Sequence, residues 1–190
     1  MPALEAQTST LLIIDLQQRL MPAIADSGRV VANARRLIAA ARLLDVPISA
    51  TEQYPEGLGG TVPGLLDADV PVYSKTTFDS MKTPSIAEAI RPEGRYVVAG
   101  CEAHVCVLQT VLGLLAHGCD VAVVQDAIGS RIEDNRKAAC RRMERHGAEP
   151  VTTEMVLFEW LGDSRNPRFR EAMKLIKPMK ADQEPATGAE

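Results

Sequence analysis

The sequence is poor in the residues that build metal centres and disulfide frameworks. It has three histidines and four cysteines in 190 residues, and none of the cysteines (Cys101, Cys106, Cys119 and Cys140) forms a C-x-x-C pair. A structural zinc site needs four such ligands at short spacing, so the sequence predicts none. The first residues show no secretory signal, and we expect reduced thiols in a cytoplasmic protein.

Long apolar runs and an excess of positive charge are also missing. No apolar stretch approaches the roughly 20 residues of a membrane-spanning helix. The net charge of -4 argues against a nucleic-acid partner, because phosphate binding requires clustered positive charge. The 46% of hydrophobic residues and 24% of charged residues are typical of a soluble protein with a sizeable core. We expect neither a membrane nor a nucleic acid as partner.

Short apolar runs alternate with longer segments of helical period, which is typical of a parallel sheet covered by helices. We expect strands at residues 11–16, 47–50, 70–74, 95–100, 120–125 and 149–152. We expect helices at residues 28–44, 84–90, 103–117, 132–146, 153–161 and 167–176. The predicted fold is α/β, a doubly wound three-layer domain over residues 1–177. The Gly- and Pro-rich segment 52–70 is predicted to be a long surface loop, and 178–190 a disordered tail.

Three polar residues stand where such a sheet binds its ligands, at the carboxyl ends of strands. Asp15 follows the run LLII, Lys75 follows VPVYS, and Cys106 lies in the first turn of the helix after YVVAG. A charge beside a buried strand is costly unless it is paired, so we expect Asp15 and Lys75 to be neighbours. A helix N-terminus lowers a thiol pKa. Cys106 is thus a candidate nucleophile with Asp15 as its base.

Each of these residues also has a plainer interpretation. A lone apolar cysteine is usually a core residue, Asp15 could cap a turn, and Lys75 could be a solvated strand end. His104, two residues before Cys106, suggests a Cys–His dyad, but side chains at i and i+2 of a helix point apart. We therefore expect His104 at the pocket rim or in a structural role. A redox pair of Cys101 and Cys106 is another alternative.

Three segments resemble motifs of the isochorismatase-like cysteine hydrolases. They are IIDLQQRL with Asp15, SKTTFDS with Lys75 and VVAGCEAHVCV with Cys106. They occur in the family's order, and the likeness runs from about residue 9 to residue 160. The segment TEQYPEGLGGTVP resembles the isochorismatase domain-containing proteins of undefined substrate. The resemblance implies a six-stranded parallel sheet and an Asp15–Lys75–Cys106 triad. It also implies hydrolysis of an amide, imide or carbamoyl C–N bond through a covalent thioester.

The resemblance further implies a cis peptide bond at Cys101–Glu102 and an oxyanion site formed by the backbone N–H groups of Glu102 and Cys106. Isochorismatase itself lacks the cysteine and cleaves a vinyl ether, so Cys106 indicates the amidase-like branch. Metal-binding nicotinamidases carry an Asp-x-His cluster after the second strand, whereas residues 52–55 here contain no histidine. We therefore expect neither a metal nor another cofactor. Relatives with this fold commonly form dimers or larger rings, so we expect a homo-oligomer.

Four side chains near the motifs are candidates for contact with a small-molecule substrate. Gln17 and Gln53 offer amide donors and acceptors, and Tyr54 and Phe78 could line an apolar part of the pocket. A structural role is the alternative for Tyr54 and Phe78, and an exposed surface position is the alternative for Gln17 and Gln53. For the whole chain, the alternative to catalysis is a protein that keeps the fold for binding or as a scaffold and is catalytically silent.

Overall fold

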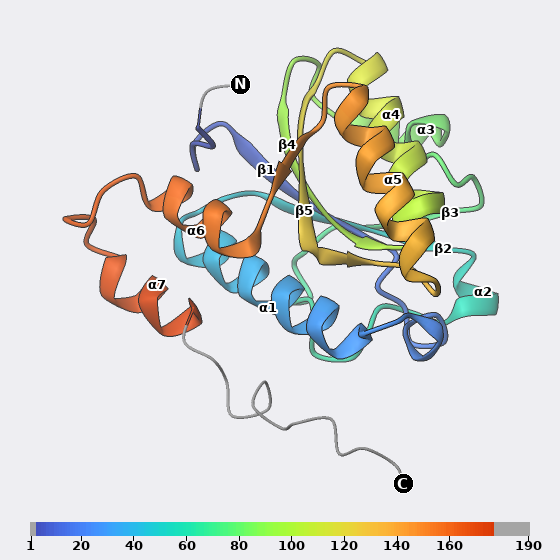
Figure 1. The fold of residues 1–190 in the computed structure, drawn as a ribbon, viewed down its shortest axis with the longest axis horizontal. Helices are drawn as coiled ribbons and strands as arrows, with labels where there is room; N and C mark the ends of the chain where they lie inside the picture. Colours follow the sequence, from blue (N-terminus) through green and yellow to red (C-terminus); the bar gives the residue numbers. More distant parts are fainter. Residues whose placement is uncertain (1–2, 177–190) are drawn as a thin grey trace, which may run out of the picture.

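Six parallel strands form the sheet on which the molecule is built (Figure 1). The computed structural model describes residues 3–176. The strands are β1 (Ser9–Ile14), β2 (Ile48–Gln53), β3 (Val72–Lys75), β4 (Arg95–Cys101), β5 (Asp120–Gly129) and β6 (Glu149–Val151). Their order is β3-β2-β1-β4-β5-β6, and every neighbouring pair is parallel. The predicted fold class and the six-stranded sheet are confirmed.

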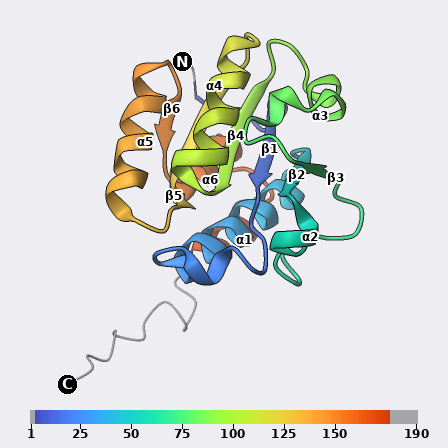
Figure 2. The same ribbon diagram turned by 90° about the vertical axis from the view of Figure 1, so that its right-hand side faces the viewer.

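Helices cover both faces of this sheet (Figures 1 and 2). On one side lie α1 (Ser27–Leu43), α6 (Thr153–Leu161) and α7 (Phe169–Ile176), and on the other lie α3 (Pro84–Ala89), α4 (Leu108–Ala116) and α5 (Glu133–Arg145). The short α2 (Pro55–Leu58) follows β2. Three single turns complete the set, the 3-10 turns η1 (Met21–Ala23) and η2 (Ser80–Lys82) and the π-helical turn η3 (Ala103–Val107).

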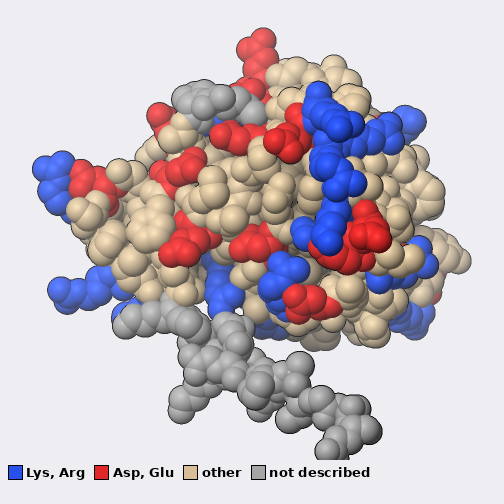
Figure 3. All heavy atoms as spheres, viewed as in Figure 1, with Lys and Arg blue, Asp and Glu red and all other residues tan. Residues whose placement is uncertain are grey.

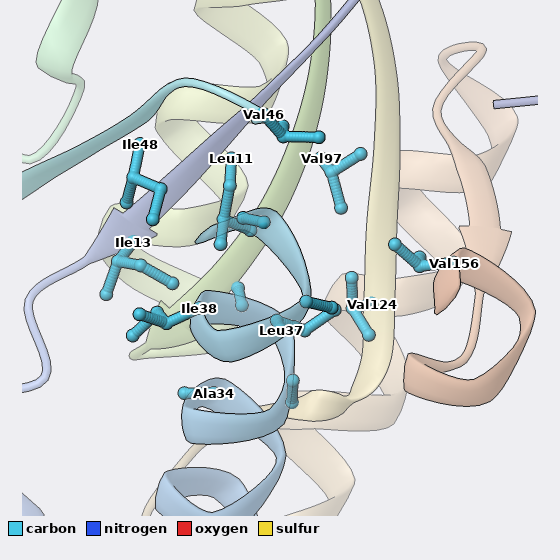
Figure 4. Packing of buried hydrophobic residues seen from close by; sticks show 14 of the residues in the cluster. Leu11, Ile13, Ala34, Leu37, Ile38, Val46, Ile48, Val97, Val124 and Val156 are labelled. Atoms are coloured by element: carbon cyan, nitrogen blue, oxygen red, sulfur yellow. The ribbon is translucent and has the colours of Figure 1, made fainter. Parts of the chain in front are cut away.

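The apolar residues of the central strands alternate between two cores, because successive side chains of a strand point to opposite faces. In β1, Leu11 and Ile13 pack toward α1 (Figure 4), whereas Leu12 and Ile14 pack toward α4. Both faces are buried, which is why this strand reads as a continuous apolar run in the sequence. Among residues 3–176, no helix is long and apolar enough to cross a membrane.

Most predicted elements are found within a few residues of their expected bounds, and three differences matter for the site. β5 continues to Gly129 instead of ending at residue 125. The helix expected from residue 103 begins as the π-helical turn η3 and becomes α-helical only at Leu108. The loop predicted at 52–70 contains α2 and pairs with Gln17 through Thr61. The predicted tail 178–190 lies outside the described residues.

The direction of the strand order reverses between β1 and β4, and this is where a doubly wound sheet opens a crevice at its carboxyl edge. Gly100 lies at this point, paired with Ile14 and with φ +134. A Cβ atom at Gly100 would lie 2.0 Å from the Ile14 carbonyl oxygen. Only glycine fits this approach of the two central strands, whose ends lead into Asp15 and Glu102.

The substitution Gly100→Ala should destabilise the fold by about 2–4 kcal/mol, because the new methyl group overlaps backbone and the φ value disfavours a side chain. Urea denaturation followed by circular dichroism measures this loss. Gly28→Ala in α1 is the matched control, since a Cβ there meets nothing within 4 Å. The control should leave stability unchanged or raise it by up to about 1 kcal/mol. Equal stability of the two variants would contradict the packing argument.

Candidate active site

Asp15, Lys75 and Cys106 all lie at the carboxyl edge of the sheet, each placed by a different strand. Asp15 follows β1 with a left-handed backbone (φ 50) that turns the chain out of the strand. Lys75 is the last residue of β3, and Cys106 lies in η3 after β4. The three residues are 0%, 3% and 6% exposed, respectively. The interpretation of Lys75 as a solvated strand end is therefore wrong.

The Asp15 carboxylate and the Lys75 ammonium form a fully buried ion pair. Lys75 Nζ donates to Asp15 Oδ2 at 2.7 Å, and both side chains are 0% exposed. The two residues are thus the neighbours that the sequence predicted. Removing two charges from water costs several kcal/mol for each ion, and direct pairing together with further hydrogen bonds must offset this cost.

Two residues of β2 supply those further hydrogen bonds. Thr51 Oγ1 donates to Asp15 Oδ1 at 2.7 Å, and the Asp15 N–H donates to the Thr51 carbonyl at 3.1 Å. Gln53 Oε1 accepts from Lys75 Nζ at 2.8 Å. β2 lies between β1 and β3 in the sheet, so its carboxyl end lies between Asp15 and Lys75.

The Cys106 thiol belongs to the same cluster. Its Sγ lies 3.9 Å from Gln53 Oε1, in a geometry that allows the thiol to donate. Burial and the charge of Asp15 raise the pKa of this thiol to about 12, and the Lys75 ammonium lowers it by less. The expectation of a pKa lowered by the helix N-terminus is therefore wrong. The resting group is a neutral thiol next to an ion pair.

The turn that carries Cys106 is shaped by the preceding residues. The peptide bond between Cys101 and Glu102 is cis, as the resemblance implied. The Glu102 carbonyl accepts from the N–H groups of Val105 and Val107. Within the described residues, the Glu102 N–H has no hydrogen-bond acceptor. It is therefore free to donate to a group that enters the site.

Side chains of this turn bind the segment after β5. The Glu102 carboxylate accepts from the Arg131 N–H at 3.0 Å and from Arg131 Nε at 3.1 and 3.2 Å. His104 Nδ1 and Ser130 Oγ lie 3.0 Å apart. His104 thus pairs with β5's end, in agreement with the structural role expected for it.

The four predicted substrate contacts divide into two groups, since Gln17 and Gln53 are buried whereas Tyr54 and Phe78 are exposed. Gln17 is fully buried, and its amide donates to the carbonyls of Gln53 and Gly59 and accepts from the Gln53 N–H. These bonds hold the loops after β1 and β2 together, which is a structural role. They argue against contact between Gln17 and a substrate. Tyr54 and Phe78 are 55% and 51% exposed, and both follow strands at the carboxyl edge of the sheet.

Sequence reasoning missed two further residues at this edge. Thr51 gave no signal by itself. It lies two residues before Gln53 in β2, so the two side chains point to the same face of the sheet. Ile132 was expected only as the first residue of a helix. In the structure it precedes α5, follows β5 and is 60% exposed. Both become recognisable only once the strand order is known.

A metal site is not evident in the part of the chain that the structure describes. No three side chains of His, Cys, Asp or Glu there lie close enough together to hold an ion. Glu52, the one acid in residues 52–55, accepts instead from the Thr61 N–H and hydroxyl at 2.6 and 2.7 Å. The four cysteines are free thiols, including the Cys101 and Cys106 considered as a redox pair.

The electrostatics of Cys106 predict opposite effects for its two charged neighbours. Asp15→Asn should lower the thiol pKa, because it removes the charge that opposes the thiolate and leaves Lys75 with the thiolate as counter-ion. Lys75→Met should raise the pKa. Since each pKa unit is a tenfold change in thiolate below the pKa, we expect alkylation at pH 9 to change by about tenfold in each direction.

Iodoacetamide labelling followed by peptide mass spectrometry measures these rates site by site. Cys140 on α5 serves as the internal reference in each sample, and thermal unfolding checks that each variant is folded. In the wild type, the labelling rate of Cys106 should still be rising at pH 10, since its pKa is about 12. A shift in the same direction for both variants would refute this account of the thiol.

Comparison with known proteins adds an independent line of evidence. Residues 9–155 match the family model of the isochorismatase domain. "Isochorismatase domain-containing protein 2" of Xenopus laevis is 40% identical over 173 residues, which cover 90% of this chain and 84% of the relative.

Solved structures give the same result. The MAR1 ribonuclease structure from Caenorhabditis elegans has a TM-score of 0.87 at 36% identity and covers 99% of this chain and 100% of that one. YcaC from Pseudomonas aeruginosa, with hexane-2,5-diol and covalent acrylamide, has a TM-score of 0.84 at 25% identity, covering 91% of each chain. The YcaC product of Escherichia coli, described as an octameric hydrolase of unknown specificity, scores 0.80 at 25% identity over 90% and 95% of the two chains. The protein therefore belongs to the isochorismatase family and is a hydrolase.

Proposed function

We propose that the protein is a metal-independent cysteine hydrolase that cleaves a C–N bond of a small amide, imide or carbamoyl compound through a covalent thioester. One observation carries this proposal, namely the buried Cys106 thiol beside the Asp15–Lys75 ion pair. A nucleophile, a base and a fixed positive charge then lie within one cluster. These are the groups that acyl transfer to sulfur requires.

In the first half of the proposed reaction, Asp15 accepts the thiol proton as Cys106 Sγ attacks the carbonyl carbon. Lys75 stabilises the thiolate character of the sulfur. The N–H groups of Glu102 and Cys106 donate to the oxyanion of the tetrahedral intermediate. Asp15 then returns its proton to the leaving nitrogen, the C–N bond breaks, and the amine departs from an acyl thioester.

In the second half, water attacks the thioester carbonyl while Asp15 takes a proton from it. The same two N–H groups bind the second oxyanion. The C–S bond breaks, and the proton held by Asp15 returns to the sulfur as the acid leaves. The net charge of Asp15, Lys75, Cys106 and the reacting acyl group together is zero before and after each proton transfer, which suits a largely buried site.

The surroundings of the cluster favour a small substrate. Tyr54, Phe78 and Ile132 are exposed apolar side chains that follow β2, β3 and β5 at the same edge of the sheet. They provide an apolar rim outside a thiol that is only 6% exposed. The acrylamide bound covalently in YcaC from Pseudomonas aeruginosa is itself a small amide, and supports this substrate size.

The name ribonuclease, which the similar structure from Caenorhabditis elegans bears, is not transferred to this chain. Figure 3 shows a stripe of Lys and Arg side chains over α5, whose exposed members include Lys137, Arg141 and Arg145. The first turn of α5 carries Glu133 and Asp134 instead. That turn is the end nearer to η3, since Ser130 and Arg131 just before it contact His104 and Glu102. The basic residues of the last turn, Arg142 and Arg145, therefore lie toward the other end of the helix, away from Cys106.

We also propose that the protein is a homo-oligomer, since the similar YcaC product of Escherichia coli is an octamer. Exposed Tyr54, Phe78 and Ile132 would suit partial burial in such an assembly. Light scattering of the full chain tests this proposal independently of the chemistry.

The hydrolase proposal predicts that Cys106→Ala abolishes turnover. Wild-type protein should release ammonia or amine from at least one member of a panel of small amides, imides and ureides. The variant should lose at least about 10³-fold in kcat, because no covalent intermediate can form. Cys119→Ala is the matched control, since that thiol is also buried but contacts the Arg91 carbonyl, away from the cluster.

Hydroxylamine should intercept the acyl thioester as a hydroxamate, and mass spectrometry of quenched reactions should place the acyl group on the Cys106 peptide. Hydrolysis by Cys106→Ala at the wild-type rate would refute the mechanism. A folded wild-type protein that hydrolyses no member of the panel and forms no adduct would favour the alternative, a catalytically silent binding or scaffold protein.

A further inference from the structure

The Gln53 side chain contacts both the ion pair and the thiol. Its Oε1 accepts from Lys75 Nζ at 2.8 Å and lies 3.9 Å from Cys106 Sγ. Its Nε2 donates to the Thr76 carbonyl at 2.8 Å. These partners define the orientation of the amide, since Lys75 can only donate and the Thr76 carbonyl can only accept. No polar atom of the Gln53 side chain remains without a partner.

The backbone of Gln53 is held just as firmly. The Gln53 N–H donates to Gln17 Oε1 at 2.8 Å, and Gln17 Nε2 donates to the Gln53 carbonyl at 3.0 Å. Gln17 is itself fully buried. The carboxyl end of β2 is therefore fixed before Gln53 reaches Lys75.

We propose that Gln53 is a positioning residue of the cysteine site, whose neutral amide holds the Lys75 ammonium beside Cys106. This inference rests on the proposed role of Cys106 as the nucleophile. It differs from the expectation that Gln53 binds substrate, because both polar atoms of its amide already bond within the protein, Oε1 to Lys75 and Nε2 to Thr76. A positioning residue alters the reactivity of the thiol even when no substrate is present.

The Gln53 side chain carries no charge, and the absence of a charge at this position favours formation of the thiolate. Asp15 and Lys75 are the charged groups that act on the thiol, and the rise in pKa caused by Asp15 already exceeds the lowering caused by Lys75. The Glu102 carboxylate is paired with Arg131 on the side of the turn that faces β5. A second carboxylate at position 53 would pair with Lys75 and place a negative charge within about 4 Å of the sulfur, which opposes thiolate formation.

The test compares Gln53→Glu, Gln53→Met and Gln18→Glu in the full-length protein, with acrylamide as the probe. The Cys106 sulfur adds to the β carbon of acrylamide, and the α carbon takes a proton from water. Peptide mass spectrometry gives the adduct rate at each pH from 7 to 10. Gln18 is exposed, so Gln18→Glu adds the same charge outside the cluster.

Gln53→Glu should shift the Cys106 profile to higher pH and slow adduct formation at pH 8 by about tenfold for each pKa unit of the shift. Gln53→Met should also slow it, because Lys75 loses one of its two acceptors and no longer stays beside the sulfur. Gln18→Glu should match the wild type, as should Cys140 in every variant. If Gln53→Glu does not fold, Gln53→Met still carries the test.

An unchanged Cys106 profile in either folded variant at position 53 would overturn the proposal. If that unchanged profile came with a raised KM for an amide substrate, Gln53 would be a substrate contact instead. The outcome is separate from that of the proposed function. Adduct formation requires no turnover, whereas the hydrolase proposal fails only if Cys106→Ala retains hydrolysis or the folded wild type hydrolyses no substrate.

Discussion

The Asp15–Lys75 ion pair is the interaction on which the geometry of the site depends. Its two charges are removed from water completely, so each must be compensated within the protein. The pair also spans two strands that are not neighbours, because β2 lies between β1 and β3. The end of β2 must therefore supply a donor for the carboxylate and an acceptor for the ammonium. Thr51 and Gln53, two residues apart on one face, do so.

Burial, together with the Asp15 charge of this pair, explains why the thiol is neutral at rest. A lone helix N-terminus would favour the thiolate, but Cys106 is buried and lies beside a carboxylate whose effect on its pKa exceeds that of the ammonium. When a proton passes from the sulfur to Asp15, the negative charge that opposes the thiolate is removed. The Lys75 ammonium then has the thiolate as its counter-ion. Proposed catalysis thus begins from an internal proton transfer rather than from a standing thiolate, and an exposed, reactive anion is not needed.

Much of the fold and part of the site could be predicted from the sequence. The predictions that were wrong or missing have physical reasons. The strands were visible because both faces of the central strands are apolar, and Asp15 and Lys75 were visible because charges interrupt those runs. Thr51 was not visible, since threonine is common in strands and its role depends on which strand lies next to β1. Gln53 was a candidate substrate contact because its amide can donate and accept hydrogen bonds, and its partners Lys75 and Thr76 follow only from the strand order. The pKa of Cys106 was misjudged because the local helix argument ignores burial and a neighbour 91 residues away in the chain.

The division between the cluster and its rim follows from the same geometry. The polar side-chain atoms of Thr51 and Gln53 are bonded within the protein, and the pair between Asp15 and Lys75 leaves little capacity for selecting a substrate by hydrogen bonds. The central strands that hold this cluster tolerate little change, since a Cβ atom added at Gly100 would lie 2.0 Å from the Ile14 carbonyl oxygen. Loops after β2, β3 and β5 carry the exposed Tyr54, Phe78 and Ile132. We therefore propose that substrate choice is determined mainly by these loops, which can vary while the buried pair and the thiol keep their geometry.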